Sequence, residues 1–368
     1  MSDGYCRLAL RQNKNQNKKM NVRLTQIDGK LPNLALMKLS HFHKSQGDNV
    51  FFEQSIVRGL FEPNYNIVYG SAIFSTSQKK IAQFKENFKG AIVGGTGTND
   101  NCTTVEKIIN FANREKLPLL IIGNGTNLLF PDNEVKGIVM RIGEPYLCKV
   151  SRNKDIVKSQ AGISLSSLLN FTIQEEFSGL EFMAGIPGTL GGAITMNAGA
   201  YGKRIGEFVA KVEVMDKKCK IYWLNNSELG FGYRKSRFQL GDEIILSAIL
   251  EFPPEADSPC AKKPVKHETI KTKIEEILKH RKANLPLDFS SAGCVFKNST
   301  QEPAGKLIEL AGCKGLKIGD AEVSTKHANF IINKGKATSE DVKSLIAEVR
   351  KRVYKQFKVS LELEIRVL

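Results

Sequence analysis

A glycine-rich segment near the middle of the chain constrains the fold more than any other feature of the sequence. Residues 184–193 read AGIPGTLGGA, so four glycines and one proline fall within ten residues. This composition makes a poor interior for a helix or a strand. One interpretation is a backbone surface that a ligand approaches closely, and the other is a structural loop of tight turns. The segment lacks the G-x-G-x-x-G pattern of a βαβ unit, which disfavours a Rossmann fold.

A second glycine-containing turn follows a short apolar run. Residues 119–122 (LLII) are typical of a strand, and residues 123–127 (GNGTN) come directly after it. Glycine allows tight turns that point several backbone N–H groups at one anion. Any tight turn uses glycine and asparagine, so this signal alone is ambiguous. Two such segments in one chain suggest a large phosphate-bearing cofactor, such as a flavin dinucleotide.

Hydrophobic periodicity predicts helices and strands in mixed order, which indicates an α+β protein of two lobes. Helices are expected at 103–116, 164–175, 267–282, 303–311 and 339–356. Strands are expected at 119–122, 138–142, 208–215, 219–224, 244–252 and 360–368, and a loop at 291–298. We expect a poorly ordered leader at 1–65, a cofactor-binding domain at 66–252 and a substrate domain at 253–368. The last of these begins with a Pro-rich linker.

Composition narrows the class of protein and its partners. Seven cysteines without a C-x-x-C pair argue against a zinc site and against a disulfide framework, and so predict a cytoplasmic protein with no metal. No apolar run reaches about 18 residues, so no membrane insertion is expected. The net charge of +16 would suit nucleic acid. The lysines are spread over the chain without a recognition motif, so we expect an anionic small substrate and no nucleic-acid partner.

Three further segments carry residues that could act on a substrate. Residues 231–236 read FGYRKS, an aromatic and basic turn in which Arg234 could equally be a surface residue. Residues 290–298 read SSAGCVFKN, where Cys294 could be accessible to a ligand or could be a buried, inert thiol. In residues 361–366 (LELEIR), alternation places the charged side chains on one face, which normally meets solvent.

Together these segments resemble the UDP-N-acetylenolpyruvoylglucosamine reductases (MurB), of the second type, which lacks an insertion found in the first. Seven pieces lie in order between residues 103 and 368: GNGTNLL, AGIS, SGLEFMAGIPGTLGGAITMNAGAYG, FGYRKS, SSAGCVFKN, AGKLIELAGCKGLKIGDAEVSTKHANFIIN and LELEIR. The resemblance implies an FAD-binding fold of the vanillyl-alcohol-oxidase (PCMH) type with a C-terminal α+β substrate-binding lobe. It also implies a tightly but noncovalently held FAD.

The activity that the resemblance implies is a two-step reduction. NADPH gives a hydride to the flavin, which passes it to UDP-N-acetylglucosamine enolpyruvate, and the product is UDP-N-acetylmuramate for peptidoglycan synthesis. Hydride addition pushes negative charge onto the substrate carboxylate, where donors are needed. By the resemblance, Arg234 and a protonated Glu364 polarise that carboxyl group, and Cys294 protonates the carbanion. An unperturbed thiol pKa of about 8.5 would leave about 97% of Cys294 protonated at pH 7.

The resemblance also assigns binding residues. Cofactor contacts are implied at Gly123, Asn124, Gly125, Thr126, Asn127, Gly185, Ile186, Pro187, Gly188, Gly191, Gly192, Asn197, Gly199 and Ala200. Substrate contacts are implied at Tyr233, Lys297, Asn298, His327 and Asn329.

One segment departs from the family pattern. Members have a T-F-x-I-G-G-x-A segment before the first helix of the flavin lobe, and residues 93–96 (VGGT) are at best a degraded copy. A polar run, residues 97–101, follows where apolar residues are expected. Either a divergent strand pair still supports FAD, or the flavin site is weakened. The alternatives to the reductase are a different flavoprotein oxidoreductase of the same fold and a non-catalytic descendant.

Overall fold

The computed structural model describes residues 21–26, 40, 43–53, 67–71, 78–88, 92–94, 101–252, 267–299 and 302–368. The chain forms two compact units, Met1–Lys116 and Leu117–Leu368. No helix in these described ranges is long and apolar enough to cross a membrane.

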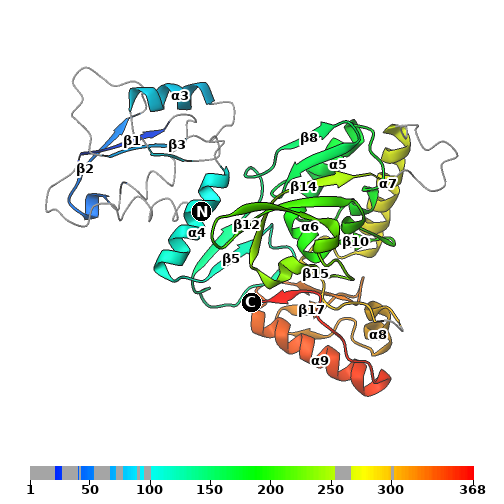
Figure 1. The fold of residues 1–368 in the computed structure, drawn as a ribbon. Coiled ribbons are helices and arrows are strands. Elements are labelled where there is room, and N and C mark those ends of the chain that lie inside the picture. The colour runs from blue at the N-terminus through cyan, green and yellow to red at the C-terminus, as the bar shows by residue number, and fades with distance from the viewer. Residues whose placement is uncertain are drawn as a thin grey trace. The chain divides into compact units, whose positions relative to one another are not determined.

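The first unit contains a parallel four-stranded sheet with the order β2-β1-β3-β4. Its elements are β1 (Asn21–Gln26), β2 (Asn49–Glu53), β3 (Ile67–Ser71), α3 (Gln78–Asn87), β4 (Ile92–Gly94) and α4 (Asn101–Glu115). Val22 and Leu24 of β1 are fully buried, as is Phe84 on the apolar face of α3. Figure 1 shows α3 lying along this sheet.

This sheet crosses the expected domain boundary at 65/66. The strand that begins at Ile67 pairs with β1, whose residues the sequence placed in a leader. Parallel strands need long crossover connections, so their pairing leaves little trace in local periodicity. Val93 and Gly94 belong to β4 of the same sheet and pair with Gly70 and Ser71. The expected linker at 253–264 lies outside the described residues.

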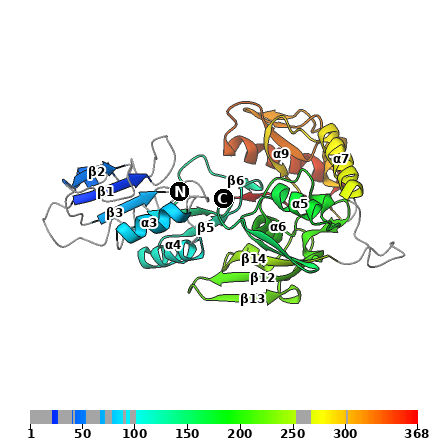
Figure 2. The same ribbon diagram turned by 90° about the horizontal axis from the view of Figure 1, so that it is seen from above.

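The second unit is built on a five-stranded antiparallel sheet with the order β13-β12-β14-β9-β8. Its strands are β8 (Val150–Asn153), β9 (Ile156–Gln160), β12 (Val209–Asp216), β13 (Ile221–Asn225) and β14 (Glu243–Glu251). Three helices accompany them: α5 (Leu165–Gln174), α6 (Leu190–Met196) and α7 (His267–Asn284). A short parallel pair joins β5 (Leu119–Ile122) to β7 (Ile138–Arg141). Figure 2 shows β12, β13 and β14 side by side, with α6 next to them.

The C-terminal part of this unit has its own sheet, with the order β15-β18-β17-β16. Its elements are β15 (Ser290–Cys294), α8 (Ala304–Leu310), β16 (Lys317–Ile318), β17 (Ala321–Val323), β18 (Phe330–Asn333) and α9 (Ser339–Phe357). A hydrophobic core that includes Ile308, Leu345 and Val349 joins the helices to this sheet. The chain then returns to pair β19 (Arg366–Val367) with β6 (Leu128–Leu129).

Three local expectations were wrong. Ser290–Cys294 is a strand paired with β18, not a loop. The glycine-rich segment contains the short helix α6, because the backbone of Gly191 packs against Ala161 and its N–H donates to Ala161 O over 2.8 Å. The expected strand 360–368 is regular only at Arg366–Val367, so Glu362 and Glu364 do not share a solvent face.

Asp132 ties the segment after β6 to the start of α9. Its carboxylate accepts hydrogen bonds from Ser339 N at 2.7 and 2.9 Å and from Ser339 Oγ at 3.0 Å. These bonds satisfy N–H groups that a helix leaves free in its first turn. The backbone hydrogen bond from Ser339 is the main cause of a lowered Asp132 pKa.

We expect Asp132→Ala to lower the thermal midpoint by a few degrees, since the start of α9 loses its acceptor. Because the folded-state pKa is lowered, the contribution is present above the ordinary aspartate pKa and is lost as pH falls through the folded-state value. Thermal melts at neutral and acidic pH measure this difference. Asp155→Ala, in the exposed β8–β9 turn, is the control, and an equal effect of both changes would contradict the assignment.

Candidate active site

The two glycine-containing turns meet in space. Thr126 Oγ1 donates a hydrogen bond to Pro187 O over 3.1 Å. A Cβ atom on Gly123 would lie 2.5 Å from Thr189 Oγ1, so a side chain there would force the turns apart. Gly188 has a φ of +141°, which L side chains rarely adopt. Thr126 and Pro187 are 61 positions apart in the sequence, yet their two turns form one surface of exposed backbone.

The donors of this surface suit a pyrophosphate. Within the described part of the chain, the N–H groups of residues 124–127 donate to no other protein group. The same holds for the N–H groups of Gly185, Gly188 and Thr189. Converging free backbone N–H groups form anion-binding concavities. Residues of both turns would thus hold the phosphates of FAD, as the sequence predicts for positions 123–127 and 185–188.

We expect Gly188→Val to lower FAD retention at least about tenfold, because a side chain enters the cradle beside Thr126. Visible absorbance after gel filtration measures the bound flavin. Gly241→Val is the matched control, since Gly241 also has a positive φ (+78°) but no atom within 4 Å of its Cβ position. Equal flavin loss in both variants would mean that backbone strain, not the cradle, is responsible.

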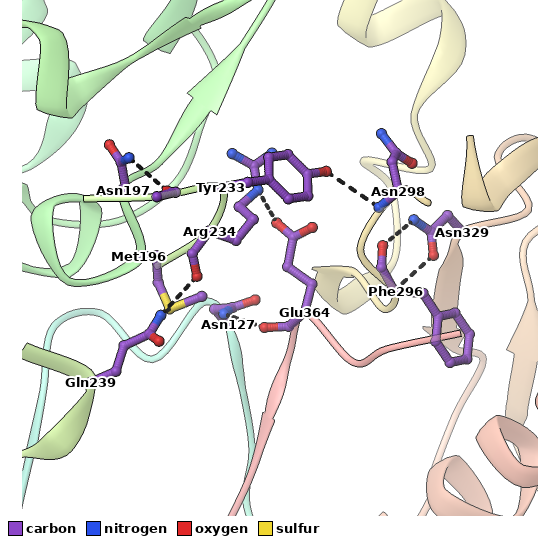
Figure 3. A network of polar contacts seen from close by, with 11 residues as sticks. Asn127, Met196, Asn197, Tyr233, Arg234, Gln239, Phe296, Asn298, Asn329 and Glu364 are labelled. Carbon is purple, nitrogen blue, oxygen red and sulfur yellow. Dashed lines mark hydrogen bonds and ion pairs between the residues drawn. The ribbon is translucent and has the colours of Figure 1, made fainter. Parts of the chain in front are cut away.

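Arg234 lies in a strained turn that other side chains hold in place. Gly232 and Lys235 exchange backbone hydrogen bonds, and Arg234 has a φ of +52°. Asn197 Nδ2 donates to Gly232 O over 2.8 Å, and Gln239 Nε2 donates to Arg234 O over 2.9 Å (Figure 3). A non-glycine residue in this region costs about 1–3 kcal/mol, and such residues cluster at functional sites.

The strained turn presents Arg234 to Glu364 in the C-terminal segment. Nε of Arg234 lies 2.6 Å from Oε1 of Glu364, and both side chains are largely buried (Figure 3). The Nε–H is not aligned for a good hydrogen bond with this oxygen, although the two atoms are close. Asn127 Nδ2 donates to Glu364 O, and Glu364 N donates to Val295 O. Burial raises the pKa of Glu364, and Arg234 only partly offsets this effect.

Cys294 ends β15 opposite Phe330 and belongs to the same cluster. Burial, and next the charge of Glu364, raise the pKa of its thiol to about 12, although the Arg234 charge lowers it. The thiol is therefore more firmly protonated than its unperturbed pKa suggests. The preceding Gly293 has a φ of +83°, and no atom beyond its chain neighbours lies within 4 Å of its Cβ position.

Among the expected substrate residues, Tyr233 lies in the Arg234 turn, and the other four lie in the C-terminal part of the chain. Asn298 N donates to the Tyr233 hydroxyl over 3.3 Å, which brings the Arg234 turn against β15 and its following loop (Figure 3). Lys297 Nζ lies 3.2 Å from Glu362 Oε2. Asn329 is buried and exchanges hydrogen bonds with the backbone of Phe296. These two hydrogen bonds show that Asn329 shapes the backbone that follows β15.

His327 and several expected cofactor residues also have structural partners. His327 Nδ1 accepts from Asn329 N, and burial lowers the His327 pKa. The side chain of Asn197 holds Gly232 and Gly206, and the backbone of Gly191 packs against the strand end at Ala161. Direct contacts of these residues with a ligand stay predictions.

Two residues in this region carried no local sequence signal. Gln239 holds the backbone of Arg234, and Arg281 on α7 lies against Gly185. Gln239 lies within a short 3-10 helix and Arg281 in a basic helix end, where polar residues are ordinarily solvated. Their roles depend on contacts with Arg234 and Gly185, so a local sequence pattern does not predict them.

Comparison with known proteins identifies the family. The model of the UDP-N-acetylenolpyruvoylglucosamine reductase C-terminal domain matches residues 285–368, and an FAD binding domain model matches residues 100–225. A reductase of this name from Caldanaerobacter subterraneus subsp. tengcongensis is 40% identical over 299 residues, which is 81% of this chain and 94% of the relative. The chain belongs to the UDP-N-acetylenolpyruvoylglucosamine reductase family.

Other relatives agree with this membership. The reductase from Clostridium novyi is 36% identical over 77% of this chain and 90% of its own length. The crystal structure of the reductase MurB from Thermus caldophilus matches with a TM-score of 0.58 and 33% identity, over 71% of this chain and 88% of that one. The family, the α+β class with an FAD-binding fold, and FAD as cofactor are thus confirmed as predicted from the sequence.

Proposed function

We propose that this reductase uses NADPH and FAD to convert UDP-N-acetylglucosamine enolpyruvate into UDP-N-acetylmuramate for peptidoglycan synthesis. The carrying observation is that Arg234, Glu364 and Cys294 come together from three distant segments in a chain that also has a backbone cradle for FAD. Bound FAD would supply the route by which a hydride passes from NADPH to the substrate.

Arg234 and Glu364 act on the substrate carboxylate. Hydride addition to the terminal alkene carbon leaves an electron pair on the neighbouring carbon, which delocalises onto the carboxylate as an enediolate. The Arg234 guanidinium and the neutral, protonated form of Glu364 stabilise this charge because they are in place before it develops. The raised pKa of Glu364 supports this protonated form.

Cys294 completes the reduction. The S–H bond breaks, a C–H bond forms at the carbanion carbon, and the electron pair stays on sulfur until solvent returns a proton. Hydride and proton together add two electrons and two hydrogens across the double bond. A thiol with a pKa of about 12 is fully protonated at neutral pH, which a proton donor requires.

The test is an anaerobic visible spectrum of the purified holoenzyme, with NADPH added first and the enolpyruvyl UDP-sugar second. Bleaching of the flavin band followed by its recovery on adding the sugar is the expected result. Bleaching without recovery would indicate a flavoprotein with a different oxidant. Absence of a flavin band after reconstitution with FAD would favour a non-catalytic descendant.

The substrate and compartment also follow from this proposal. The described cysteines Cys148, Cys219, Cys294 and Cys313 are all free, which fits a reducing compartment. A cytoplasmic site supplies NADPH and the nucleotide sugar, and the strongly basic chain suits a substrate with a diphosphate and a carboxylate.

Glu364→Gln should remove one limb of the pH profile. In the wild type, the rate of flavin reoxidation by substrate should fall as pH rises through the raised pKa of Glu364, because the carboxyl loses its proton. The amide of the variant cannot ionise, so this fall should disappear, with a rate within about tenfold of wild type at lower pH. Stopped-flow reoxidation across pH measures it. The control is Glu362→Gln: Glu362 is exposed, so this variant should keep the wild-type pH profile.

A further inference from the structure

The side chain of Gln239 holds the backbone carbonyl of Arg234. Gln239 Nε2 donates a hydrogen bond to Arg234 O over 2.9 Å, and no other group in the described residues donates to this oxygen. The same Nε2 lies 3.4 Å from Met196 Sδ, which is a weak acceptor. An amide turned the other way would place its oxygen against two acceptors, so these contacts fix its orientation. Figure 3 shows Gln239 meeting the main chain of Arg234, whose guanidinium extends toward Glu364.

The backbone of Arg234 needs such a restraint. Arg234 is the second of the two residues between Gly232 and Lys235, which exchange backbone hydrogen bonds, and its φ is +52°. Glycine and asparagine are the usual residues at a positive φ in this position, because a Cβ atom makes it unfavourable. A relaxation toward negative φ would change the direction of the Arg234 Cα–Cβ bond relative to the turn. The hydrogen bond from Gln239 opposes this relaxation, because it fixes the carbonyl group on the other side of Cα.

Other side chains hold the ends of the turn but not Arg234 itself. Asn197 Nδ2 donates to Gly232 O over 2.8 Å, and Ser236 Oγ donates to Thr195 O over 2.7 Å. Both bonds attach the turn to the end of α6. The Nε–H of Arg234 makes no well-aligned hydrogen bond in the described part of the chain. The direction of the guanidinium therefore depends on the backbone at Arg234.

Gln239 lies on a firmly anchored support. It belongs to η5 (Arg237–Leu240), in which Phe238 is buried. Arg237 pairs with Glu243 of β14 through two hydrogen bonds, of 2.8 and 2.9 Å. These contacts fix η5 against the antiparallel sheet, so the amide of Gln239 can hold its acceptor in one place.

We propose that Gln239 is a positioning residue that keeps the Arg234 guanidinium aimed at the substrate carboxylate during flavin reoxidation. The inference rests on the proposed function, in which Arg234 stabilises the charge that develops on that carboxylate. Gln239 acts through the backbone of Arg234. The reduction of the flavin by NADPH does not use Arg234 in the proposed function, so the loss of Gln239 impairs only the second half-reaction.

The test compares Gln239→Met, Gln239→Lys and Gln356→Met in the FAD-loaded full chain. Anaerobic stopped flow gives the rates of flavin reduction by NADPH and of reoxidation by the enolpyruvyl UDP-sugar. In Gln239→Met, the ratio of reoxidation to reduction should fall about tenfold, because a small misplacement of a reacting group is costly. Gln239→Lys keeps an N–H donor on a chain of comparable length and should restore most of the ratio. Gln356 also donates to a backbone carbonyl, Leu310 O, but between α8 and α9, so Gln356→Met should match the wild type.

A double-mutant cycle tests whether the effect passes through Arg234. In the Arg234→Met background, adding Gln239→Met should change the single-turnover reoxidation rate by less than about twofold, because no guanidinium is left to position. A tenfold fall in this background as well would overturn the proposal, since Gln239 would then act by another route. Equal slowing of both half-reactions with loss of FAD would also overturn it, and so would a Gln239→Met variant that behaves as the wild type.

A second readout needs no substrate. Burial raises the pKa of Glu364 and the charge of Arg234 lowers it, so a displaced guanidinium should leave this pKa higher. Carbon-13 NMR of the labelled carboxyl, assigned with Glu364→Gln, follows its titration. Gln239→Met should raise the pKa of Glu364 and Gln356→Met should not, and an unchanged titration in Gln239→Met would contradict the proposal. Wild-type enzyme that the sugar fails to reoxidise would refute the proposed function instead, and this titration would still decide whether Gln239 positions Arg234.

Discussion

Cys294→Ala should leave flavin reduction by NADPH close to the wild-type rate and slow reoxidation by the enolpyruvyl UDP-sugar about 10²–10⁴-fold. The alanine keeps the backbone of β15 but removes the S–H group that would protonate the carbanion carbon. Separate stopped-flow measurements of the two half-reactions give both rates. The reduced flavin should therefore persist in the presence of the sugar.

The controls for this variant use the other thiols and pH. Cys219→Ala, in the β12–β13 turn, should behave as wild type, and Cys294→Ser should keep part of the reoxidation rate because a hydroxyl still carries a proton. Since the Cys294 pKa is raised to about 12, ionisation of the thiol should cause no loss of reoxidation rate up to about pH 10. Normal turnover by Cys294→Ala would show that another group donates the proton.

Arg234→Met should slow reoxidation about 10²–10³-fold, the usual cost of removing one group that stabilises an oxyanion. Methionine fills part of the same volume but cannot compensate the charge that develops on the substrate carboxylate. Glu364 would also lose its cation at 2.6 Å, so its pKa should rise further. Stopped-flow reoxidation with saturating sugar separates this loss from weaker binding.

Arg237 supplies the matched control for Arg234. It follows the same turn and also pairs with a carboxylate, Glu243, at 2.8 and 2.9 Å, but that pair ties η5 (Arg237–Leu240) to β14. Arg237→Met should lower the thermal stability of the protein, with a smaller effect on the rate of flavin reoxidation. A double change of Arg234 and Glu364 should cost less than the sum of the single changes, because the two act on one group. Full additivity would contradict a shared role.

Elements with a strong local pattern were predicted closely. The apolar run at Leu119–Ile122 is β5 as expected, and α5 begins after Ser164, whose side chain accepts a hydrogen bond from Ser167 N as an N-cap. Helix α9 begins with a capping box formed by Thr338 and Asp341. These signals are readable because helix caps and apolar periodicity depend only on residues a few positions apart.

Elements that depend on distant partners were not predicted. β1 and β2 pair in parallel across more than twenty residues, and nothing in their local pattern distinguishes them from a polar leader. α6 forms in a segment with poor helix propensity because tertiary hydrogen bonds, such as Gly191 N to Ala161 O, support it. The strand Ser290–Cys294 likewise needs β18 as its partner.

The sequence by itself determined the family and the reaction class, and it predicts Arg234, Cys294 and Glu364 as site residues, since these motifs and the glycine turns are local patterns. Only the tertiary structure decided which groups share a charge environment. It places Arg234 Nε 2.6 Å from Glu364 Oε1 and brings Arg281 against Gly185. It also shows that the Asn197 side chain donates a hydrogen bond to Gly232 O. The pKa of a buried group depends on desolvation and on charges from every neighbouring element, and no linear pattern records those distances.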